Sequence, residues 1–426
     1  MKVFVVGKGA REHALVWKIL KSPLVKKVYS FPGNAGIAGI AEIPQLSDDS
    51  IETLCSFALK EGIDLTVVGP EEYLAKGIVD RFEAKGLKIF GTNKAASKLE
   101  SSKVFAKEIM AFAKIPTASY STVENFEKGE LVLKSSKFPV VLKADGLAAG
   151  KGVVICSSYE EAVNELKEML SGKFESAGAK VVIEEFLKGE ELSLLLLTDG
   201  KSVKKLLFSQ DHKALSDGDK GPNTGGMGAY TPVSFADSKL YEKVNLQITE
   251  PLLKELKNRG IKYKGVLYIG LMIVNGKPFV LEYNARFGDP ETEPLLFMLK
   301  SDIVPYFLGS IQENLETLPE LEWTEGYGVT TVIASGGYPG SYKKGELISG
   351  LDKVGEECKV FHAGTAFKDG KVVTDGGRVL MVTSSGETIS KALENVYKNV
   401  EKIEFNNAFF RRDIAHRELI REKNDN

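Results

Sequence analysis

Cysteine and histidine are scarce in this sequence of 426 residues. The three cysteines, Cys55, Cys156 and Cys358, stand far apart, and no two of them form a C-x-x-C pair. The four histidines are equally scattered. A zinc site of the cysteine/histidine type is therefore not expected, because such sites need closely spaced ligands. An odd, sparse set of cysteines instead indicates thiols in a reducing compartment.

Long apolar runs and an excess of one charge are also missing. No stretch approaches the roughly 20 apolar residues that a membrane-spanning helix requires. The apolar run Val3–Val6 leads directly into a glycine turn, which predicts a buried strand rather than a signal segment. The net charge is −2, and Lys and Arg are spread along the chain. These features predict a cytoplasmic protein that binds neither nucleic acid nor a membrane.

The first hundred residues alternate between short apolar runs and segments with helical spacing. This rhythm is typical of a parallel sheet covered by helices on both faces. Ligands of such sheets bind beyond the carboxyl ends of the strands, here the loops Gly7–Arg11, Gly33–Gly36 and Gly69–Glu71. The predicted elements are strands at Val3–Val6, Lys27–Phe31, Asp64–Val68 and Lys88–Phe90, and helices at Glu12–Lys21, Ile51–Glu61 and Tyr73–Lys85.

The pattern changes after about residue 101. The further predicted elements are helices at Ser102–Phe112, Tyr159–Leu170, Ser238–Asn258 and Ile389–Val400, an antiparallel pair Leu192–Leu197 and Val203–Ser209, a hairpin within Val266–Tyr283, and strands at Gly328–Ala334, Lys359–Phe367 and Val379–Ser384. We predict a multidomain protein of the α/β and α+β classes. Its parts are a Rossmann-like parallel-sheet domain at 1–101, a domain at 102–314 with a mobile lid at about 118–190, and a small mixed α+β domain at 325–426, after an acidic linker at Leu315–Glu325.

The first glycine loop, Gly7–Arg11, follows a strand and opens a helix, as in dinucleotide-binding proteins. The third glycine of that motif would fall on Glu12, and the second strand offers no acid for a ribose hydroxyl. A nicotinamide or flavin cofactor is therefore not favoured. A tight turn without a ligand is the simpler interpretation. An anionic substrate whose phosphate meets the helix N-terminus, with Arg11 close by, fits better.

The second glycine loop joins two strands between Lys143 and Val153 and is rich in small residues. Small residues let the backbone approach an anion closely, and Lys143 and Lys151 bracket the loop. It is not a Walker A loop, because no Ser or Thr follows Gly150-Lys151 and no helix follows the loop. An ordinary hairpin connection is the alternative. We favour a flap that closes over a triphosphate.

A strong local pattern surrounds the Asn275-Gly276 turn, which stands between two apolar runs and predicts a tight hairpin. Side chains alternate along a strand, so Glu282 and Asn284 share one face. Two hard oxygen ligands, followed by Arg286, suit Mg²⁺ that bridges ATP phosphates. The alternative is an exposed polar face with Arg286 paired to Glu282. The constrained polar turn Phe287–Thr292 weighs against that alternative.

Eight blocks, in order along essentially the whole chain, closely resemble the phosphoribosylamine–glycine ligase (glycinamide ribonucleotide synthetase) family of ATP-grasp enzymes. These blocks are Gly9–Ala14, Pro32–Gly36, Val68–Glu71, Leu142–Gly152, Gln210–Lys213, Gly221–Tyr230, Asn284–Thr292 and Gly376–Val379. The resemblance implies a pre-ATP-grasp domain followed by an ATP-grasp domain. It implies an ADP-forming carbon–nitrogen ligase of de novo purine synthesis, in which 5-phosphoribosylamine, glycine and ATP give glycinamide ribonucleotide through glycyl phosphate. The implied cofactors are ATP and Mg²⁺, with Mn²⁺ as the alternative ion.

The resemblance also implies roles for individual residues. Those implied to bind ATP are Lys103, Lys143, Gly150, Lys151, Gly152, Glu184, Glu185, Phe186, Leu187, Glu191 and Asn223, with the segment from Glu184 on the adenine and Glu191 on the ribose. Those implied to bind the other substrates are Gly9, Arg11, Gly33, Asn34, Gly69, Pro70, Glu71, Asp289, Pro290 and Arg378. The implied catalytic residues are Arg286, Lys213 and Asp211, and the implied metal ligands are Glu282 and Asn284. In one departure, Gly270 stands where other ATP-grasp enzymes carry a first metal carboxylate.

A Ser/His/Asp or Cys/His catalytic set is not expected, because an acyl phosphate needs no protein nucleophile and charge neutralisation suffices. We expect small-molecule substrates, a monomer, and transient contact with the preceding pathway enzyme. Two alternatives stay open. The chain is another ATP-grasp carboxylate–amine ligase, or it is a non-catalytic nucleotide-binding protein. The retained Lys143, Glu282, Asn284 and Arg286 argue against the second alternative, since a protein without activity has no physical need for them.

Overall fold

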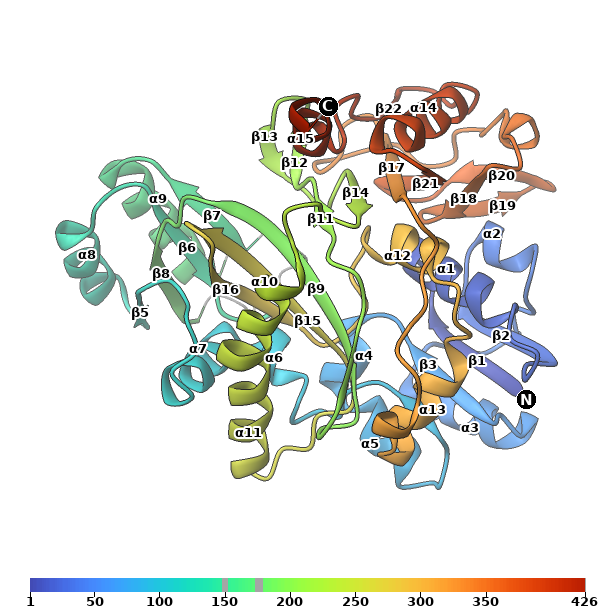
Figure 1. Ribbon diagram of the computed structural model, residues 1–426, viewed down its shortest axis with the longest axis horizontal. Helices are drawn as coiled ribbons and strands as arrows, with labels where there is room; N and C mark the ends of the chain where they lie inside the picture. The colour runs from blue at the N-terminus through green and yellow to red at the C-terminus, as the bar shows by residue number, and fades with distance from the viewer. Residues whose placement is uncertain (148–151, 173–178, 426) are drawn as a thin grey trace.

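The computed structural model describes residues 1–147, 152–172 and 179–425. Figure 1 shows the N-terminal sheet in blue at the lower right, with the C-terminal sheet in orange and red above it. The sheet formed by residues 120–185 projects at the far left, in teal. A long antiparallel sheet in green and yellow connects these parts through the middle of the molecule.

The N-terminal part is a four-stranded parallel sheet between two layers of helices. Its elements are β1 (Lys2–Gly7), α1 (Ala10–Ile19), β2 (Lys27–Pro32), α2 (Ala35–Ala38), α3 (Ile51–Glu61), β3 (Leu65–Val68), α4 (Glu71–Lys76), α5 (Ile78–Glu83), β4 (Ile89–Phe90), α6 (Lys98–Ser101) and α7 (Lys103–Phe112). The strand order is β2-β1-β3-β4. Because side chains alternate along β1, Phe4 and Val6 pack with α3–α5, whereas Val3 and Val5 pack with α1. The predicted parallel sheet is confirmed.

The helix predicted at Tyr73–Lys85 is wrong in one respect, because the structure contains two shorter helices, α4 and α5. Gly77 separates them with a φ of +91°. That left-handed conformation ends the first helix, and glycine adopts it without the steric penalty that a Cβ would bring.

The segment from residue 120 to 185 forms a separate antiparallel sheet in the order β5-β8-β6-β7. Its elements are β5 (Tyr120–Val123), α8 (Phe126–Ser135), β6 (Val140–Ala144), β7 (Val153–Cys156), α9 (Tyr159–Leu170) and β8 (Val181–Glu185). Leu142, Leu166 and Ile183 are buried in the core between this sheet and its helices. The two strands predicted to flank the second glycine loop are therefore β6 and β7, while 148–151 lie outside the described residues.

The central sheet has the order β10-β9-β15-β16. The elements of this region are β9 (Glu190–Thr198), β10 (Val203–Lys205), α10 (Ser238–Val244), η1 (Asn245–Thr249), α11 (Glu250–Asn258), β15 (Gly265–Val274), β16 (Lys277–Asn284), α12 (Thr292–Met298), α13 (Val304–Gln312) and η2 (Leu315–Thr317). Leu194 and Ile269 face the core shared with α7, α10 and α11, whereas Leu195 and Tyr268 face the core shared with α12 and α13. The predicted hairpin is confirmed, with positive φ at Asn275-Gly276 as a type I′ turn requires.

Two predicted elements of this region differ from the structure. The strand expected at Val203–Ser209 ends at Lys205, and Ser209 instead forms an isolated bridge with Ser193. The helix expected at Ser238–Asn258 is continuous but contains the π-helical turn η1 in its middle. Pro251 follows that turn and has no N–H to donate, so the regular α-helical hydrogen-bond pattern is interrupted there.

The C-terminal sheet has the order β11-β14-β17-β21-β18, with β22 paired to β17. The elements are β11 (Gln210–Asp211), β12 (Ala214–Ser216), β13 (Lys220–Asn223), β14 (Gly228–Thr231), β17 (Tyr327–Ser335), η3 (Leu351–Lys353), β18 (Cys358–His362), β19 (Thr365–Lys368), β20 (Lys371–Thr374), β21 (Arg378–Gly386), α14 (Ile389–Val400), β22 (Ala408–Phe409) and α15 (His416–Asp425). Strands β11 and β14 reach this sheet from far upstream in the chain. Val396 of α14 is buried against one face of this sheet. Phe361 of β18 points to the other face, into the core shared with α1 and α12.

Two C-terminal predictions need correction. The strand expected at Lys359–Phe367 is split into β18 and β19, because the chain turns at Ala363-Gly364. The segment Leu315–Glu325, expected as a linker, packs onto the domain before it. Leu315 is fully buried and its N–H donates to Asp199, while Trp323 forms a bridge with Leu299.

Two buried histidines join the N-terminal part to the C-terminal sheet. His13 Nδ1 accepts a hydrogen bond of 2.9 Å from the His362 N–H, and Asn34 donates to the His362 carbonyl at 2.6 Å. Gly36 fits between the two rings, since a Cβ there would lie 2.4 Å from His13 and 2.5 Å from His362. The contact therefore depends on close packing of neutral imidazoles.

We expect the free energy of unfolding to fall as the pH drops below about 6.5. Burial lowers the pKa of His13 well below its ordinary value, that of His212 to about 3 and that of His362 to about 4. The unfolded chain then takes up protons that the folded protein does not, which removes about 1.4 kcal/mol per histidine per pH unit. Urea titrations at pH 7.5 and 5.5 measure this loss. In the variant His13→Asn the slope should be about one third smaller; a midpoint that is constant over this range would contradict the prediction.

Candidate active site

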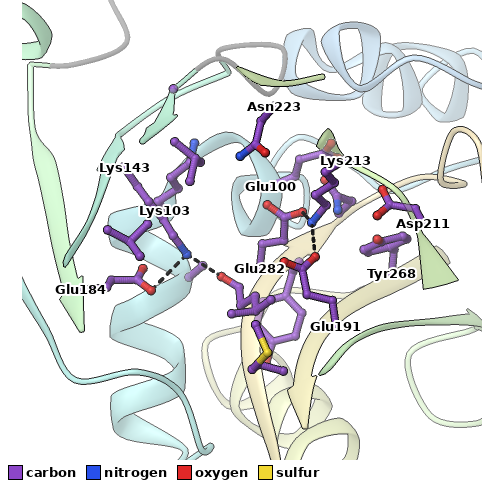
Figure 2. A pocket seen from close by; sticks show the side chains of 18 of the residues that line it. Glu100, Lys103, Lys143, Glu184, Glu191, Asp211, Lys213, Asn223, Tyr268 and Glu282 are labelled. Atoms are coloured by element: carbon purple, nitrogen blue, oxygen red, sulfur yellow. Dashed lines mark hydrogen bonds and ion pairs between the residues drawn. The ribbon is translucent and has the colours of Figure 1, made fainter. Parts of the chain in front are cut away.

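A cavity of about 430 Å³ lies between the β5-β8-β6-β7 sheet, the β15–β16 hairpin and the loops of the N-terminal sheet. Figure 2 shows Lys143, Glu184, Lys213 and Glu282 converging on it. The predicted site residues that line the cavity are Arg11, Glu71, Lys103, Lys143, Gly152, Glu184, Glu185, Phe186, Leu187, Glu191, Asp211, Lys213, Asn223, Glu282, Asn284, Arg286, Asp289 and Arg378. The described residues that were predicted but do not line it are Gly9, Gly33, Asn34, Gly69, Pro70 and Pro290. Gly150 and Lys151 lie outside the described residues.

The Glu184 carboxylate, at the end of β8, is held between two lysines. Its oxygens lie 3.1 Å from Lys107 Nζ and 3.0 Å from Lys143 Nζ, and its side chain is almost completely buried. Lys143 also donates to the Leu281 carbonyl on β16, at 3.0 Å. Burial lowers the pKa of Lys107 to about 8, although Glu184 opposes that shift. The Glu184 carboxylate thus orients Lys143 toward the cavity. Because this carboxylate is already paired with two lysines, a ligand would instead contact the backbone from Glu185 onward.

Lys103 contributes a second ammonium group from the first turn of α7. Its Nζ donates to the Gly146 carbonyl at 2.9 Å, at the start of the glycine-rich loop. Burial lowers the pKa of Lys103. The ammonium therefore lies beside Gly146 at the lining of the cavity, where it can meet an anion.

The β15–β16 hairpin presents Glu282 and Asn284 to the cavity, while Tyr283 between them is buried in the core. Burial opposes ionisation of Glu282, but Lys213, Lys143 and Lys103 hold its pKa below the ordinary value. The carboxylate is therefore charged, and the Asn284 amide adds a second hard oxygen on the same face.

The donor set of the hairpin fits a magnesium ion that takes its remaining ligands from phosphate and water. Among residues 1–147, 152–172 and 179–425 no three His, Cys, Asp or Glu side chains are grouped for metal binding. Magnesium characteristically binds through one or two carboxylates together with substrate phosphates, so a complete protein cage is not required. Gly270 lies directly opposite Glu282 on β15, so this strand offers no carboxylate at that position.

Arg286 is paired with acids other than Glu282, which contradicts the alternative of a Glu282–Arg286 surface pair. Its Nη2 lies 2.9 Å from Glu100, and its Nε lies 3.3 Å from Glu71. Burial favours the neutral acid at Glu71, yet Arg286 and Arg11 lower its pKa to about 2. The two arginines thus form a buried cationic cluster on the N-terminal side of the cavity, partly neutralised by acids.

Lys213 and Asp211 approach the cavity from β11 and the residues that follow it. Lys213 Nζ lies 3.2 Å from Glu191 and 3.9 Å from Glu282, and Glu191 raises its pKa well above the ordinary value. Burial raises the pKa of Asp211 well above normal, although Lys213 opposes that shift. Lys213 therefore remains charged beside Glu191, which the resemblance assigned to the ribose, and Glu282, which was assigned to the metal.

Arg378, at the start of β21, connects three segments at the rim of the cavity. Its guanidinium lies 3.0 Å from Asp289 and donates to the carbonyl of Asp289 at 3.1 Å and to that of Gly225 at 2.5 Å. The C-terminal sheet thereby contributes a charged group to a cavity formed mainly by the preceding parts of the chain.

Glu12 occupies the space that a dinucleotide phosphate would need at the first glycine loop. Its carboxylate accepts from the Gly9 N–H and from Arg11 Nε, both at 2.5 Å. A Cβ at Gly69 would lie 2.0 Å from a Glu12 oxygen, and a Cβ at Gly7 would lie 2.4 Å from Glu12 Cγ. The glycines therefore make room for this side chain, which agrees with the interpretation that the loop is no dinucleotide fingerprint.

Asn34 uses both ends of its side-chain amide within the protein. Its Oδ1 accepts from the Ile37 N–H at 2.9 Å, and its Nδ2 donates to the carbonyls of Lys8 and His362. Any contact of this residue with a substrate must therefore come from its backbone.

Replacing Gly69 with alanine should destabilise the protein by about 3 kcal/mol, because the new methyl group overlaps the Glu12 carboxylate and forces it to move. The urea midpoint measures the loss. Gly39→Ala is the matched control in the same domain, since its Cβ would lie 3.4 Å from the Gly36 carbonyl oxygen. Equal midpoints in the two variants would contradict the role of Gly69.

Three family models match the chain in succession. They are described as the N domain (residues 1–100), the ATP-grasp (A) domain (101–292) and the C domain (328–417) of phosphoribosylglycinamide synthetase. A phosphoribosylamine–glycine ligase from Pasteurella multocida is 45% identical, and the alignment covers 100% of both chains. The chain belongs to the phosphoribosylamine–glycine ligase family. A relative with the same name from Caldanaerobacter subterraneus is 46% identical over 97% of this chain and 99% of that one.

Solved structures agree with membership of this ligase family. The phosphoribosylamine–glycine ligase of Thermotoga maritima superimposes with a TM-score of 0.86 at 36% identity, covering 97% of this chain and 100% of that one. The biotin carboxylase domain of a Hydrogenobacter thermophilus 2-oxoglutarate carboxylase superimposes with a TM-score of 0.73 at 17% identity, over 96% and 91% of the two chains. This second likeness shows the ATP-grasp fold alone. In the described part of the chain, no helix combines the length and apolar character needed to span a membrane.

Several residues of the site were not predicted from the sequence. They are Glu12, Glu100, Lys107, Tyr268 and Glu291, all of which line the cavity or pair with residues that do. Glu12 carried a usable signal, since a charged residue at a glycine position of a tight loop must have a partner. Glu291 lies in the polar turn Phe287–Thr292, which the sequence did single out, although no role was given to this residue. Glu100, Lys107 and Tyr268 lie within helices or strands and had no signal of their own.

Proposed function

We propose that this protein joins the carboxylate of glycine to the amine of 5-phosphoribosylamine, with ATP as the energy source, and that it forms glycinamide ribonucleotide, ADP and phosphate. The observation that carries the proposal is the convergence of three lysines with Glu282 and Asn284 in one cavity, in a chain related over its whole length to such ligases. The three lysines are Lys103, Lys143 and Lys213.

In this proposal ATP lies between the lid and the β15–β16 hairpin. The backbone of Glu185–Leu187 receives the adenine, and Glu191 receives the ribose. Lys103 and Lys143 meet the phosphates, while Asn223 and the loop containing Gly150, Lys151 and Gly152 cover them. Residues of about 118–190 act as the lid, because a closed cavity keeps water away from a reactive acyl phosphate.

Glu282 and Asn284 would hold Mg²⁺, with Mn²⁺ as the alternative. A bound ion would supply positive charge that neutralises the phosphates during phosphoryl transfer. The fit rests on the charged carboxylate and the amide oxygen on one face of β16.

Glycine is a poor acyl donor at neutral pH, because the oxygen of its carboxylate is a bad leaving group. Transfer of the γ-phosphoryl group from ATP to that oxygen gives glycyl phosphate and ADP. The phosphoribosylamine nitrogen then attacks the carbonyl carbon, the C–N bond forms, and the C–O bond to phosphate breaks so that phosphate leaves. Arg286 and Lys213 would neutralise the charge of the transferring group, and Asp211, which interacts with Lys213, would accept the proton that the amine nitrogen loses. No covalent protein intermediate is required.

The loops of the N-terminal sheet would hold the ribose phosphate of the amine substrate. Arg11 and Glu71 line the cavity on this side. Gly9, Gly33, Asn34, Gly69 and Pro70 lie outside its lining, so in this proposal their backbone would meet the phosphate beyond the cavity. Asp289 and Arg378 line the cavity as well, and we assign them, with the neighbouring Pro290, to the same substrate. We further propose a cytoplasmic monomer that accepts the labile amine through transient contact with the preceding enzyme.

The test is a coupled assay of ADP release with a panel of acids and amines. ADP release should require glycine and phosphoribosylamine together, with the latter formed in situ. Release with a different pair would favour another carboxylate–amine ligase of the same fold. Calorimetric binding of ATP without turnover by any pair would favour a non-catalytic nucleotide-binding protein.

A further inference from the structure

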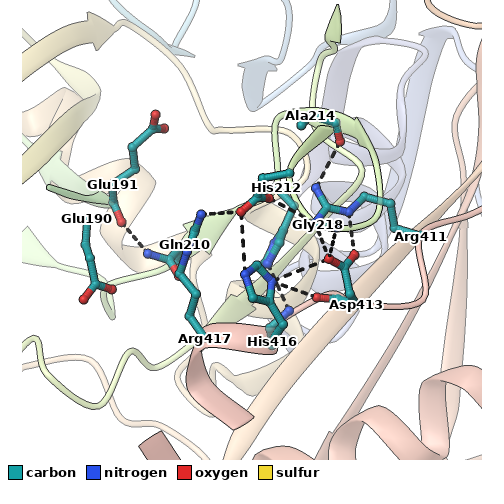
Figure 3. A network of polar contacts seen from close by, with 12 residues as sticks. Glu190, Glu191, Gln210, His212, Ala214, Gly218, Arg411, Asp413, His416 and Arg417 are labelled. Atoms are coloured by element: carbon teal, nitrogen blue, oxygen red, sulfur yellow. Dashed lines mark hydrogen bonds and ion pairs between the residues drawn. The ribbon is translucent and has the colours of Figure 1, made fainter. Parts of the chain in front are cut away.

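Arg411, which follows β22, is a fully buried arginine. It lies far along the chain from the cavity residues Lys213 and Asn223. Its side chain is 1% exposed, yet every nitrogen of the guanidinium has a partner. It donates from Nη1 to the Ala214 carbonyl (3.1 Å), from Nη2 to Asp219 (3.0 Å) and from Nε to Asp413 (2.7 Å). Figure 3 shows this network between the C-terminal segment and the β12–β13 hairpin. A planar fork with several donors can make such a set of contacts, whereas a lysine cannot.

The hairpin that Arg411 holds has little packing of its own. Strands β12 and β13 form a separate two-stranded sheet, and all four residues of β13 are exposed. Two-stranded hairpins of this kind are marginally stable in water. Lys213 immediately precedes the hairpin and Asn223 ends it, and both side chains line the active-site cavity. The position of these two groups therefore depends on what fastens the hairpin.

The C-terminal segment fastens the chain on both sides of Lys213. On one side, His212 Nε2 accepts a hydrogen bond of 3.0 Å from the Ala415 N–H. On the other side, the Ala214 carbonyl accepts from Arg411. The buried His212 ring thus acts as a second anchor, two residues before the contact of the guanidinium.

The turn of the hairpin is fastened as well. Asp219 adopts a positive φ of 55° and is paired with Arg411 and Arg417, while the Gly218 N–H donates to Asp413 at 2.7 Å. Burial opposes ionisation of Asp219, but Arg417 and Arg411 lower its pKa. The carboxylate is therefore charged and keeps both arginines bound.

The same segment reaches the strand that carries Glu191. The Tyr230 hydroxyl lies within hydrogen-bonding distance of two acceptors, Glu418 of α15 (3.1 Å) and Gln210 Oε1 (3.0 Å), which share its single proton. Gln210 in turn donates to the Glu191 carbonyl at 2.6 Å. Both Glu191 and the chain around Lys213 are thus connected to the C-terminal segment from Arg411 to Glu418.

We propose that Arg411 is a positioning residue of the nucleotide site, which holds the β12–β13 hairpin so that Lys213 and Asn223 face the bound nucleotide. The inference rests on the proposed function, because it assigns these two groups to ATP. Without the guanidinium fork the hairpin must be ordered when the nucleotide binds, and that ordering lowers affinity.

The experiment compares nucleotide affinity in Arg411→Lys and Arg411→Met with the wild-type chain. Calorimetry with ADP and with a non-hydrolysable ATP analogue gives affinity without turnover, and hydrogen exchange reports the order of residues 213–223. We expect affinity to fall about tenfold in both variants, since buried hydrogen bonds to a charged group are lost. Exchange across the hairpin should become faster. The KM for ATP should rise more than kcat falls.

Two controls separate positioning from a general loss of stability. Arg412→Met removes a neighbouring arginine whose side chain is 64% exposed and pairs with Glu401 on the surface. Val396→Ala destabilises the C-terminal core, where Val396 is fully buried away from the hairpin. Neither variant should change nucleotide affinity at temperatures well below its unfolding midpoint. If Arg411→Met does not fold, Asp413→Asn is measured instead, because it keeps Arg411 but removes a charged partner.

Wild-type affinity in Arg411→Lys overturns the proposal, and so does an equal loss of affinity in Val396→Ala. Different results would contradict the positioning role of Arg411 and the proposed ligase function. If the wild-type chain releases ADP from ATP when glycine and phosphoribosylamine are present, while Arg411→Lys matches it in affinity and exchange, then the positioning role alone is wrong. If no acid and amine support ADP release in the wild-type chain, the proposed ligase function is wrong, whatever the variants do.

Discussion

Replacing Glu282 with alanine should lower kcat about a thousandfold while the protein remains folded. Glu282 lies on β16 with its carboxylate in the cavity, and three lysines keep it charged. The carboxylate and the Asn284 oxygen are the hard ligands that the hairpin offers to an ion on the ATP phosphates. Removing the Glu282 carboxylate would leave the proposed ion without its charged protein ligand. The ion would then neither orient the phosphoryl group nor neutralise its charge.

The measurement has three parts. Turnover is followed by ADP release, folding by circular dichroism, and ion binding by the electron paramagnetic resonance of Mn²⁺ added with ADP. Lys277→Ala, at the exposed start of β16, is the matched control on the same hairpin and should behave as the wild-type chain. Glu282→Ala with near wild-type turnover, or with an unchanged Mn²⁺ signal, would refute the metal assignment.

Replacing Lys143 with methionine should weaken ATP binding by about one to two orders of magnitude, as expected when a charged hydrogen bond to phosphate is lost. Lys143 lies at the end of β6, where Glu184 and the Leu281 carbonyl hold its ammonium group. Methionine preserves the length of the side chain. Glu184 keeps its contact with Lys107, so the variant does not leave a buried carboxylate without a partner.

Calorimetry with a non-hydrolysable ATP analogue gives the affinity directly. Lys134→Met is the control, because Lys134 lies on α8 in the same lid, is exposed, and pairs with Glu130 on the surface. The control should bind as tightly as the wild-type chain. Unchanged affinity in Lys143→Met would mean that the glycine-rich loop, rather than its flanking lysine, holds the phosphates.

Much of the architecture was predictable because its signals are local. The apolar run of β1 and the Asn275-Gly276 turn depend on residues that are neighbours in the chain, and both elements are confirmed. Two of the elements that differ from expectation do so because of one or two residues. Gly77 divides a helix by adopting a positive φ, and a turn at Ala363-Gly364 divides a strand, while the apolar pattern runs on across both breaks.

The sequence by itself determined the parallel sheet, the hairpin that presents Glu282 and Asn284, the glycine-rich loop and the family. The reason is that turn chemistry, side-chain alternation and the motif blocks act over short stretches of chain. Only the tertiary structure decided which charges meet. Glu184 meets Lys143, which is 41 residues away along the chain, and Lys107, which is 77 residues away, only once β8 lies beside β6 and α7. Arg411 reaches Ala214 across nearly 200 residues, because contacts between distant segments are set by packing and leave no local pattern.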